Sequence, residues 1–378
     1  MCVSEKRRPG PSSSDFVEVL YEEREEEGFR IDGCARKIER LGRAKAQAFR
    51  FIQAIAEKYG CQVPTLKDLY DPCKRWDPVS VFGAGGFLPK HLPAKKLFEA
   101  FRCGADLRIE RVPSADYLKL RGMFCRRHLL CQACAVRRAG RELSRAMQRI
   151  EMVSLEGALA YMLTLTIKNG HDLSERYNHL RDSWRAWVHG RSRNRGRCAL
   201  RALDGGLFSL EFKRGSGSGL WHPHLHAFVV CPVNRPLPVE KVGANSWRWA
   251  EGAKEWHEIT GDSYIVDCRP VYGSDVSSSL VSGLVEVCKY AVKINGMDHA
   301  DHEESFRVLS GRRLVGSFGV LYGLRLDGPP GKALRANARD VALRRCVGQT
   351  GDLTDYHFVG SGYAVHDFCV FRAGAISG

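Results

Sequence analysis

The chain has 378 residues, 44% of them hydrophobic, and a formal net charge of +15 at pH 7. This length allows two or three domains, each with a core of its own. No apolar run reaches the roughly 20 residues that span a bilayer, and no hydrophobic segment follows the basic N-terminus, so we expect a cytoplasmic protein without a membrane partner. The positive charge predicts a polyanionic partner. Fourteen cysteines without a secretion signal predict reduced thiols or metal ligands.

The first 99 residues give little indication of a role. Prolines, serines and an acidic run in residues 1–30 predict a disordered lead. Apolar residues at helical spacing predict an amphipathic helix over 34–59, and repeated prolines and glycines predict a loop-rich connector over 60–100. We therefore treat residues 1–99 as an N-terminal extension that is partly disordered and partly helical.

Cysteines at metal-ligand spacing follow this extension. Cys131 and Cys134 have the spacing of a zinc knuckle, Cys125 adds a third thiolate, and Cys103 can complete a tetrahedral site. His128 is a competing ligand. A redox pair and a set of unrelated buried cysteines are the alternatives.

Arginines concentrate in two stretches, 121–149 and 176–201, where acids are scarce. A predicted helix over 135–152 carries much of the first stretch. Guanidinium groups bind phosphates well, although a solvated helix face would have a similar composition. We therefore interpret residues 100–152 as a cysteine-rich zinc-binding segment with a basic helix.

From residue 153 the pattern predicts an α+β domain that extends to about 325. Predicted strands and helices alternate as β-α-β-β-α-β-α, at 160–167, 174–188, 207–212, 221–230, 247–259, 264–271 and 276–294, with Ser174 as the expected cap of the first helix. This order is typical of the split βαβ arrangement, an antiparallel sheet with helices on one face. Residues 326–378 form a C-terminal segment whose role the sequence leaves open.

The strand at 221–230 carries three histidines. Because side chains on a strand alternate between faces, His224 and His226 share one face and can chelate a divalent cation. Glu211 is the expected third ligand, since its strand pairs with the histidine strand through a glycine-rich hairpin. His222 is the second choice. The alternative is three polar residues on a half-exposed strand.

A third group lies on the last predicted helix, where Glu286, Tyr290 and Lys293 are spaced i, i+4 and i+7 and so share a face. With this group the sequence resembles the rolling-circle replication initiators (Rep proteins) of small bacterial plasmids, the single-tyrosine branch of the HUH endonucleases. The resemblance rests on the motifs at 163–166, 222–226 and 286–293, together with the upstream cysteines and Gly311-Arg312-Arg313-Leu314, and it covers roughly residues 100–325.

The resemblance implies a DNA nickase that uses Mn²⁺ or Mg²⁺. In this family the tyrosine, here Tyr290, attacks a phosphodiester at the plasmid origin, retains the 5′ phosphate and frees a 3′ hydroxyl. A glutamate at the place of Glu286 is credited with activating water at termination. Lys293, one turn from Tyr290, can favour the phenolate or bind phosphate. Host helicase and polymerase are the further partners expected. The alternatives are a transposase or mobilisation relaxase of the same superfamily, and a non-enzymatic zinc-dependent DNA-binding protein.

Overall fold

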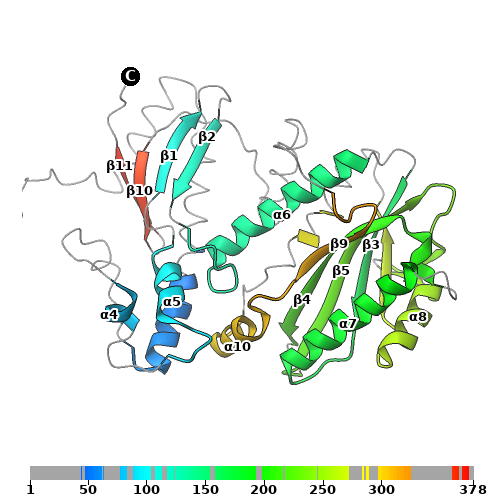
Figure 1. Ribbon diagram of the computed structural model, residues 1–378, viewed down its shortest axis with the longest axis horizontal. Coiled ribbons are helices and arrows are strands. Elements are labelled where there is room, and N and C mark those ends of the chain that lie inside the picture. The colour runs from blue at the N-terminus through cyan, green and yellow to red at the C-terminus, as the bar shows by residue number, and fades with distance from the viewer. Residues whose placement is uncertain are drawn as a thin grey trace, which may run out of the picture. The chain divides into compact units, whose positions relative to one another are not determined.

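A computed structural model describes residues 44, 47–61, 63, 77–82, 88–103, 107–112, 117–122, 124–153, 158–192, 198–215, 218–244, 246–271, 283, 284, 287, 288, 297–324, 360–365 and 368–373. The chain divides into two compact units, residues 1–135 with 350–378 and residues 136–349. We describe each unit by itself (Figure 1). Within the described residues, no helix is both long enough and apolar enough to cross a membrane.

The first unit begins with helices that pack around aromatic side chains. Residues 47–58 are helical, as predicted, and two short helices follow, α4 (Pro78–Phe82) and α5 (Ala94–Phe101). The Phe49 and Phe82 rings lie 5.3 Å and 6.4 Å from that of Phe101. The prediction of a loop-rich connector over 60–100 therefore missed these two helices, which form because buried apolar residues outweigh the local prolines.

The first unit also contains a four-stranded antiparallel sheet that the sequence did not predict. Its order is β11-β10-β1-β2, with β1 at Leu107–Val112, β2 at Tyr117–Gly122, β10 at Gly360–Val365 and β11 at Phe368–Ala373. Leu107 is opposite Gly362 in the β1–β10 ladder. The end of the chain thus completes a sheet whose first two strands lie between Cys103 and Cys125.

The second unit is built on a seven-stranded antiparallel sheet of order β6-β7-β8-β3-β5-β4-β9. Its strands are β3 (Ala158–Thr166), β4 (Gly205–Arg214), β5 (Trp221–Pro232), β6 (Val239–Gly243), β7 (Ser246–Trp249), β8 (Val266–Pro270) and β9 (Val315–Gly319). Its helices are α6 (Gln132–Val153), α7 (Leu173–Ser192), α8 (Ala250–Thr260) and α10 (His299–Leu309), with a short 3₁₀ helix at Ala199–Ala202. The histidine strand β5 lies between β3 and β4, which α7 connects.

Helices cover both faces of this sheet, so the prediction of helices on one face was incomplete. On one face α7 packs Trp184 against Phe208 and Tyr177 against Phe212, and α8 contacts α7 through Trp256 and Trp187 (Figure 1). On the opposite face α6 packs against the sheet. The residues of that core are Leu143, Ala146, Met147, Ile150, Leu207, Phe228, Val230, Leu284, Val287, Cys288 and Leu321. One end of the histidine face is therefore closed by helices.

Two local predictions need correction. Helix α7 is capped by Asp172, whose Oδ1 accepts from the N–H groups of Ser174 (2.7 Å) and Glu175 (3.1 Å), because the helix starts one residue before Ser174. Trp247 lies in a β6–β7 hairpin and not in the following helix, which begins at Ala250.

Candidate functional site

Four cysteines of the first unit form a group that can hold a metal ion. The Sγ atoms of Cys103, Cys125, Cys131 and Cys134 all lie within 4.8 Å of one another, and His128 is not part of the group. The Cys103–Cys134 and Cys125–Cys134 sulfur pairs are each 3.5 Å apart. A tetrahedral zinc site with Zn–S bonds of about 2.3 Å spaces its sulfurs by about 3.8 Å, close to what is seen.

Backbone groups point at these sulfurs, as they do around thiolate ligands. The N–H of Cys125 donates to Cys103 Sγ and that of Arg127 to Cys125 Sγ, both at 3.4 Å. The second bond depends on Arg126, which adopts φ 60° in the left-handed region. Hydrogen bonds from the neighbouring thiols lower the pKa of Cys103, which favours a thiolate. Arg127 also binds Glu99 of α5 at 2.8 Å, which ties the cysteine turn to that helix.

The histidines lie in successive rows across the sheet of the second unit. His224 is directly opposite Glu211 on β4 and Thr166 on β3, while His226 is opposite Ser209 and Thr164. Residues directly opposite in an antiparallel ladder project to the same face. The structure therefore places the three predicted ligands on one face, with the rings of His224 and His226 stacked 6.0 Å apart.

Glu211 and His226 are in direct contact. Glu211 is 2% exposed and His226 9%, and Glu211 Oε2 lies 3.1 Å from His226 Nε2. The other ring nitrogen, Nδ1, lies 3.2 Å from Thr164 Oγ1. Thr164 fixes the ring by its hydroxyl, a role that the sequence analysis missed. The signal was present in β3, where Thr164 and Thr166 are the polar positions of an otherwise apolar strand.

His224 is held in its neutral form. Burial lowers the pKa of His224 to about 4; the Glu211 carboxylate opposes this shift, whereas the charges of His226 and Lys213 add to it. Its Nδ1 is buried and has no hydrogen-bond partner among the residues that the structure describes. A neutral imidazole with an unused buried nitrogen has the chemistry of a metal ligand. Across the described chain, however, only the four cysteines form a group of three or more ligand atoms within 4.8 Å of one another.

His222 stands one row nearer the hairpin. Its ring stacks on that of His224 at 6.4 Å, and its Nε2 lies 3.3 Å from Ser218 Oγ. A Cβ at Gly215 would collide with the His222 ring, so the hairpin needs a glycine there. His222 contacts the hairpin and not Glu211.

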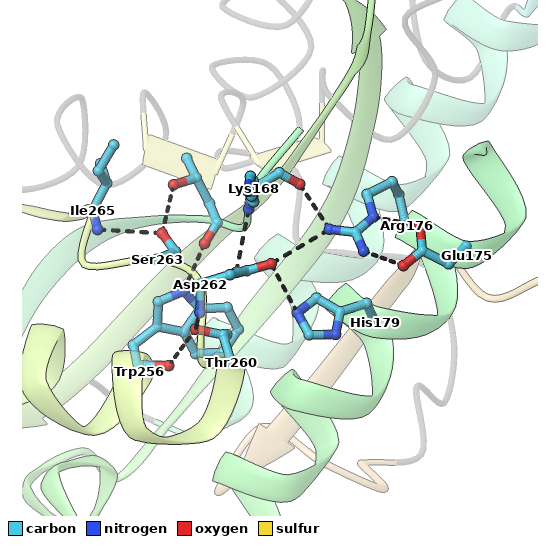
Figure 2. Close-up of polar contacts among 10 residues, drawn as sticks. Lys168, Glu175, Arg176, His179, Trp256, Thr260, Asp262, Ser263 and Ile265 are labelled. Atoms are coloured by element: carbon cyan, nitrogen blue, oxygen red, sulfur yellow. Dashed lines mark hydrogen bonds and ion pairs between the residues drawn. The ribbon is translucent and has the colours of Figure 1, made fainter. Parts of the chain in front are cut away.

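Asp262 organises the segment that follows Thr166 at the end of β3 (Figure 2). Its Oδ2 lies 3.3 Å from His179 Nε2 and 3.4 Å from Arg176 Nη1, and its Oδ1 accepts from the N–H of Lys168 at 3.3 Å. Arg176 Nη1 also donates to the carbonyl oxygen of Lys168 at 2.9 Å. This network joins α7, the loop after α8 and Lys168, which lies two residues after Thr166.

The predicted tyrosine helix is described only in part. Residues 283, 284, 287 and 288 are helical, and Leu284, Val287 and Cys288 are buried against Phe228 on the histidine face. A Cβ placed on Gly283 would lie 3.0 Å from Phe228 Cδ2. Glu286, Tyr290 and Lys293 lie outside the described residues.

A protein-family model described as a replication protein matches residues 117–332, more than half of the chain. The chain belongs to this replication protein family. Searches of curated proteins and of solved structures gave no match. In this replication protein the matched region runs from β2 past β9, so it includes the histidine strand, the residues predicted to carry Tyr290, and three of the four cysteines, with Cys103 outside it. Membership in the family supports a role in plasmid replication with DNA as the partner.

Proposed function

We propose that the chain initiates plasmid rolling-circle replication as a single-tyrosine HUH nickase. The carrying observation is the shared sheet face of Glu211, His224 and His226, next to the helical residues 283, 284, 287 and 288. In the helix predicted over 276–294, Tyr290 follows Gly283 by seven residues, about two turns, and so lies on the same face of the helix. Gly283 faces Phe228, which lies on the histidine face two residues beyond His226.

The donor set fits a divalent cation. Two imidazoles and one carboxylate share a face, and the low pKa of His224 keeps its nitrogen unprotonated at neutral pH. For His226 to bind through Nε2, its proton must sit on Nδ1, and Thr164 Oγ1 is placed to accept from it. Mn²⁺ or Mg²⁺ held by Glu211, His224 and His226 would polarise the scissile phosphate.

In the proposed reaction the Tyr290 oxygen attacks a DNA phosphorus atom. A bond forms between phosphorus and the phenolic oxygen, and the bond from phosphorus to the 3′ oxygen breaks. The phenol gives up its proton to solvent, and the leaving 3′ oxygen takes one up to become a hydroxyl. Because a phenol has a pKa of about 10, ionising it at pH 7 costs about 4 kcal/mol. Lys293, one helical turn away, favours the phenolate or holds the phosphate. Glu286 activates the water of the terminating cleavage.

The four cysteines are proposed to hold a structural zinc. Their sulfur spacing, the backbone donors aimed at Cys103 and Cys125, and the tie from Arg127 to Glu99 support a closed four-thiolate site. Zinc would thereby fix the turn from which α6 begins.

The test is incubation with a supercoiled plasmid that carries the replication origin, in Mn²⁺ or Mg²⁺. We expect nicked circles with protein attached to the 5′ end. Tyr290→Phe keeps the ring but removes the nucleophile, so it should lose nicking and the adduct while it retains DNA binding. If Tyr290→Phe nicks as well as the parent, the nucleophile lies elsewhere.

The outcome also separates the alternatives. A protein that binds DNA but forms no adduct under any divalent metal would match the non-enzymatic zinc-dependent reading. Nicking of a transfer origin or transposon end in preference to the replication origin would favour a relaxase or transposase. The family match to replication proteins favours the replication origin.

A further inference from the structure

Two lysines extend the histidine face by one row. Lys213 is directly opposite His222 in the β4–β5 ladder, and it follows Glu211 by two residues, so both project from the same face. Along the chain from β3, residues 161–167 alternate between buried and half-buried, and the exposed Lys168 continues the series of Thr164 and Thr166. Lys213 therefore lies beside His222 on β4, and Lys168 lies just beyond the end of β3, on the other side of β5.

Among the residues that the structure describes, no carboxylate neutralises the charge of either lysine. Both residues are exposed, and in the described parts of the chain neither ammonium group has a carboxylate within 4.0 Å. Arg269, another exposed cation of this unit, contacts Asp267 at 2.5 Å instead. Unpaired cations beside a buried carboxylate and two imidazoles are placed to bind an anion.

Hydrogen bonds hold the backbone of each lysine in place, while no ion pair holds its ammonium group within the described residues. Lys168 donates its N–H to Asp262 Oδ1 and accepts at its carbonyl oxygen from Arg176, as Figure 2 shows. Arg176 is itself only 12% exposed at its side chain and binds Asp262 as well. Lys213 is fixed by the ladder with β5. Such anchoring reduces the conformational entropy that binding must remove.

We propose that Lys168 and Lys213 form a phosphate subsite for single-stranded DNA, one row from the histidine and glutamate cluster. Neighbouring strands lie about 4.8 Å apart, so two strand spacings separate the lysine backbones by about 10 Å, a gap that their long side chains span over His222. Each lysine would contact one backbone phosphate of a single strand bound along this face. It rests on the proposed function only in taking DNA as the ligand of this face.

The experiment measures binding of a fluorescein-labelled oligothymidylate to the full chain over a series of salt concentrations, without added divalent metal. Each phosphate contact to a single strand contributes about 0.7 to the slope of log affinity against log salt concentration. We expect Lys168→Gln and Lys213→Gln each to reduce the slope by about 0.7, and the double variant by about 1.4. Lys168→Arg and Lys213→Arg should keep the parental slope.

The matched control is Lys254→Gln, which removes the same charge from an exposed position on α8, across the sheet. The subsite is overturned if the double variant keeps the parental slope or loses no more slope than Lys254→Gln. It is also overturned if the parent does not bind the oligonucleotide. Nicking reports separately on the proposed function. If the double variant shows the reduced salt slope but the parent never nicks origin plasmid, the subsite stands and the nickase proposal fails.

Discussion

The Glu211 side chain shows how one buried acid can define a site. A carboxylate removed from water is stable only with compensating partners, and here the His226 imidazole lies 3.1 Å away. His224 stands directly opposite on the next strand. Glu211 therefore supplies the negative charge that a site of neutral imidazoles lacks.

Replacing Glu211 with alanine should weaken the first nick and move its metal dependence to higher Mn²⁺ concentration, because an anionic ligand is lost. The measurement is the initial nicking rate across a Mn²⁺ titration. Glu258→Ala, at an exposed position on α8, should leave the titration curve unchanged. A Glu211→Ala curve that superimposes on the parent would remove Glu211 from the metal site.

Glu286→Ala should behave differently, since this residue is assigned to the water of the second cleavage. The first nick should persist, while termination slows by the roughly 10²- to 10⁴-fold that a general base contributes. Replication of a plasmid with a terminator would then yield single strands longer than unit length. Equal loss of the first nick in the Glu211 and Glu286 variants would contradict separate roles.

Strand alternation predicted that His224 and His226 share a face, because that periodicity is local, and the short glycine-rich hairpin predicted that Glu211 joins them. The hydroxyl of Thr164 was assigned no role, because its contact with His226 depends on the pairing of β3 with β5 across sixty residues of chain. Tertiary register of this kind is not readable from a single sequence.

At the scale of elements, α7 is positioned by acids near its N-terminus. Asp172 caps the helix, and Asp262 gathers Arg176 and His179 from its first two turns. Ser174 was predicted as the cap because serine is common there, but the helix includes it. The β6–β7 hairpin was missed because Trp247 and its neighbours also fit a helical stripe.

Asp262→Ala should reduce the free energy of unfolding by about 1–3 kcal/mol, because the Lys168 N–H loses its acceptor and the partly buried Arg176 loses one of its carboxylate partners. Oligothymidylate affinity should fall with it, since Lys168 loses its anchor. Urea unfolding followed by fluorescence gives the first value. Asp182→Ala, which removes only an exposed pair with Arg181, is the control and should change stability by less than about 0.5 kcal/mol. If the two substitutions reduce the free energy of unfolding equally, Asp262 contributes no more to stability than an exposed carboxylate.

On the scale of the whole molecule, the chain joins a unit stabilised around four thiols to a unit stabilised by a sheet core. The cysteine spacing allowed the metal group to be predicted. The sheet of the first unit was not predictable, since β1 pairs with β10 from the far end of the chain.

The purified protein should contain about one zinc ion that EDTA removes far more slowly than the nicking metal, because four thiolates bind zinc tightly. Metal analysis by mass spectrometry measures it. Cys131→Ser should lower zinc content, thermal stability and DNA affinity together, whereas Cys198→Ser, outside the group, should keep all three. A folded and active preparation free of zinc would contradict the assignment.

The antiparallel order of the seven-stranded sheet also affects how the protein is made. Strand β4 receives its outer neighbour, β9, only after more than a hundred further residues have been synthesised. Until Val315–Gly319 leaves the ribosome, β4 presents an open edge of hydrogen-bonding groups next to the histidine strand. Sheets closed by distant strands fold slowly, and an exposed edge pairs readily with other chains. We therefore expect the edge of β4 to stay open to other chains for as long as the segment up to β9 takes to be synthesised.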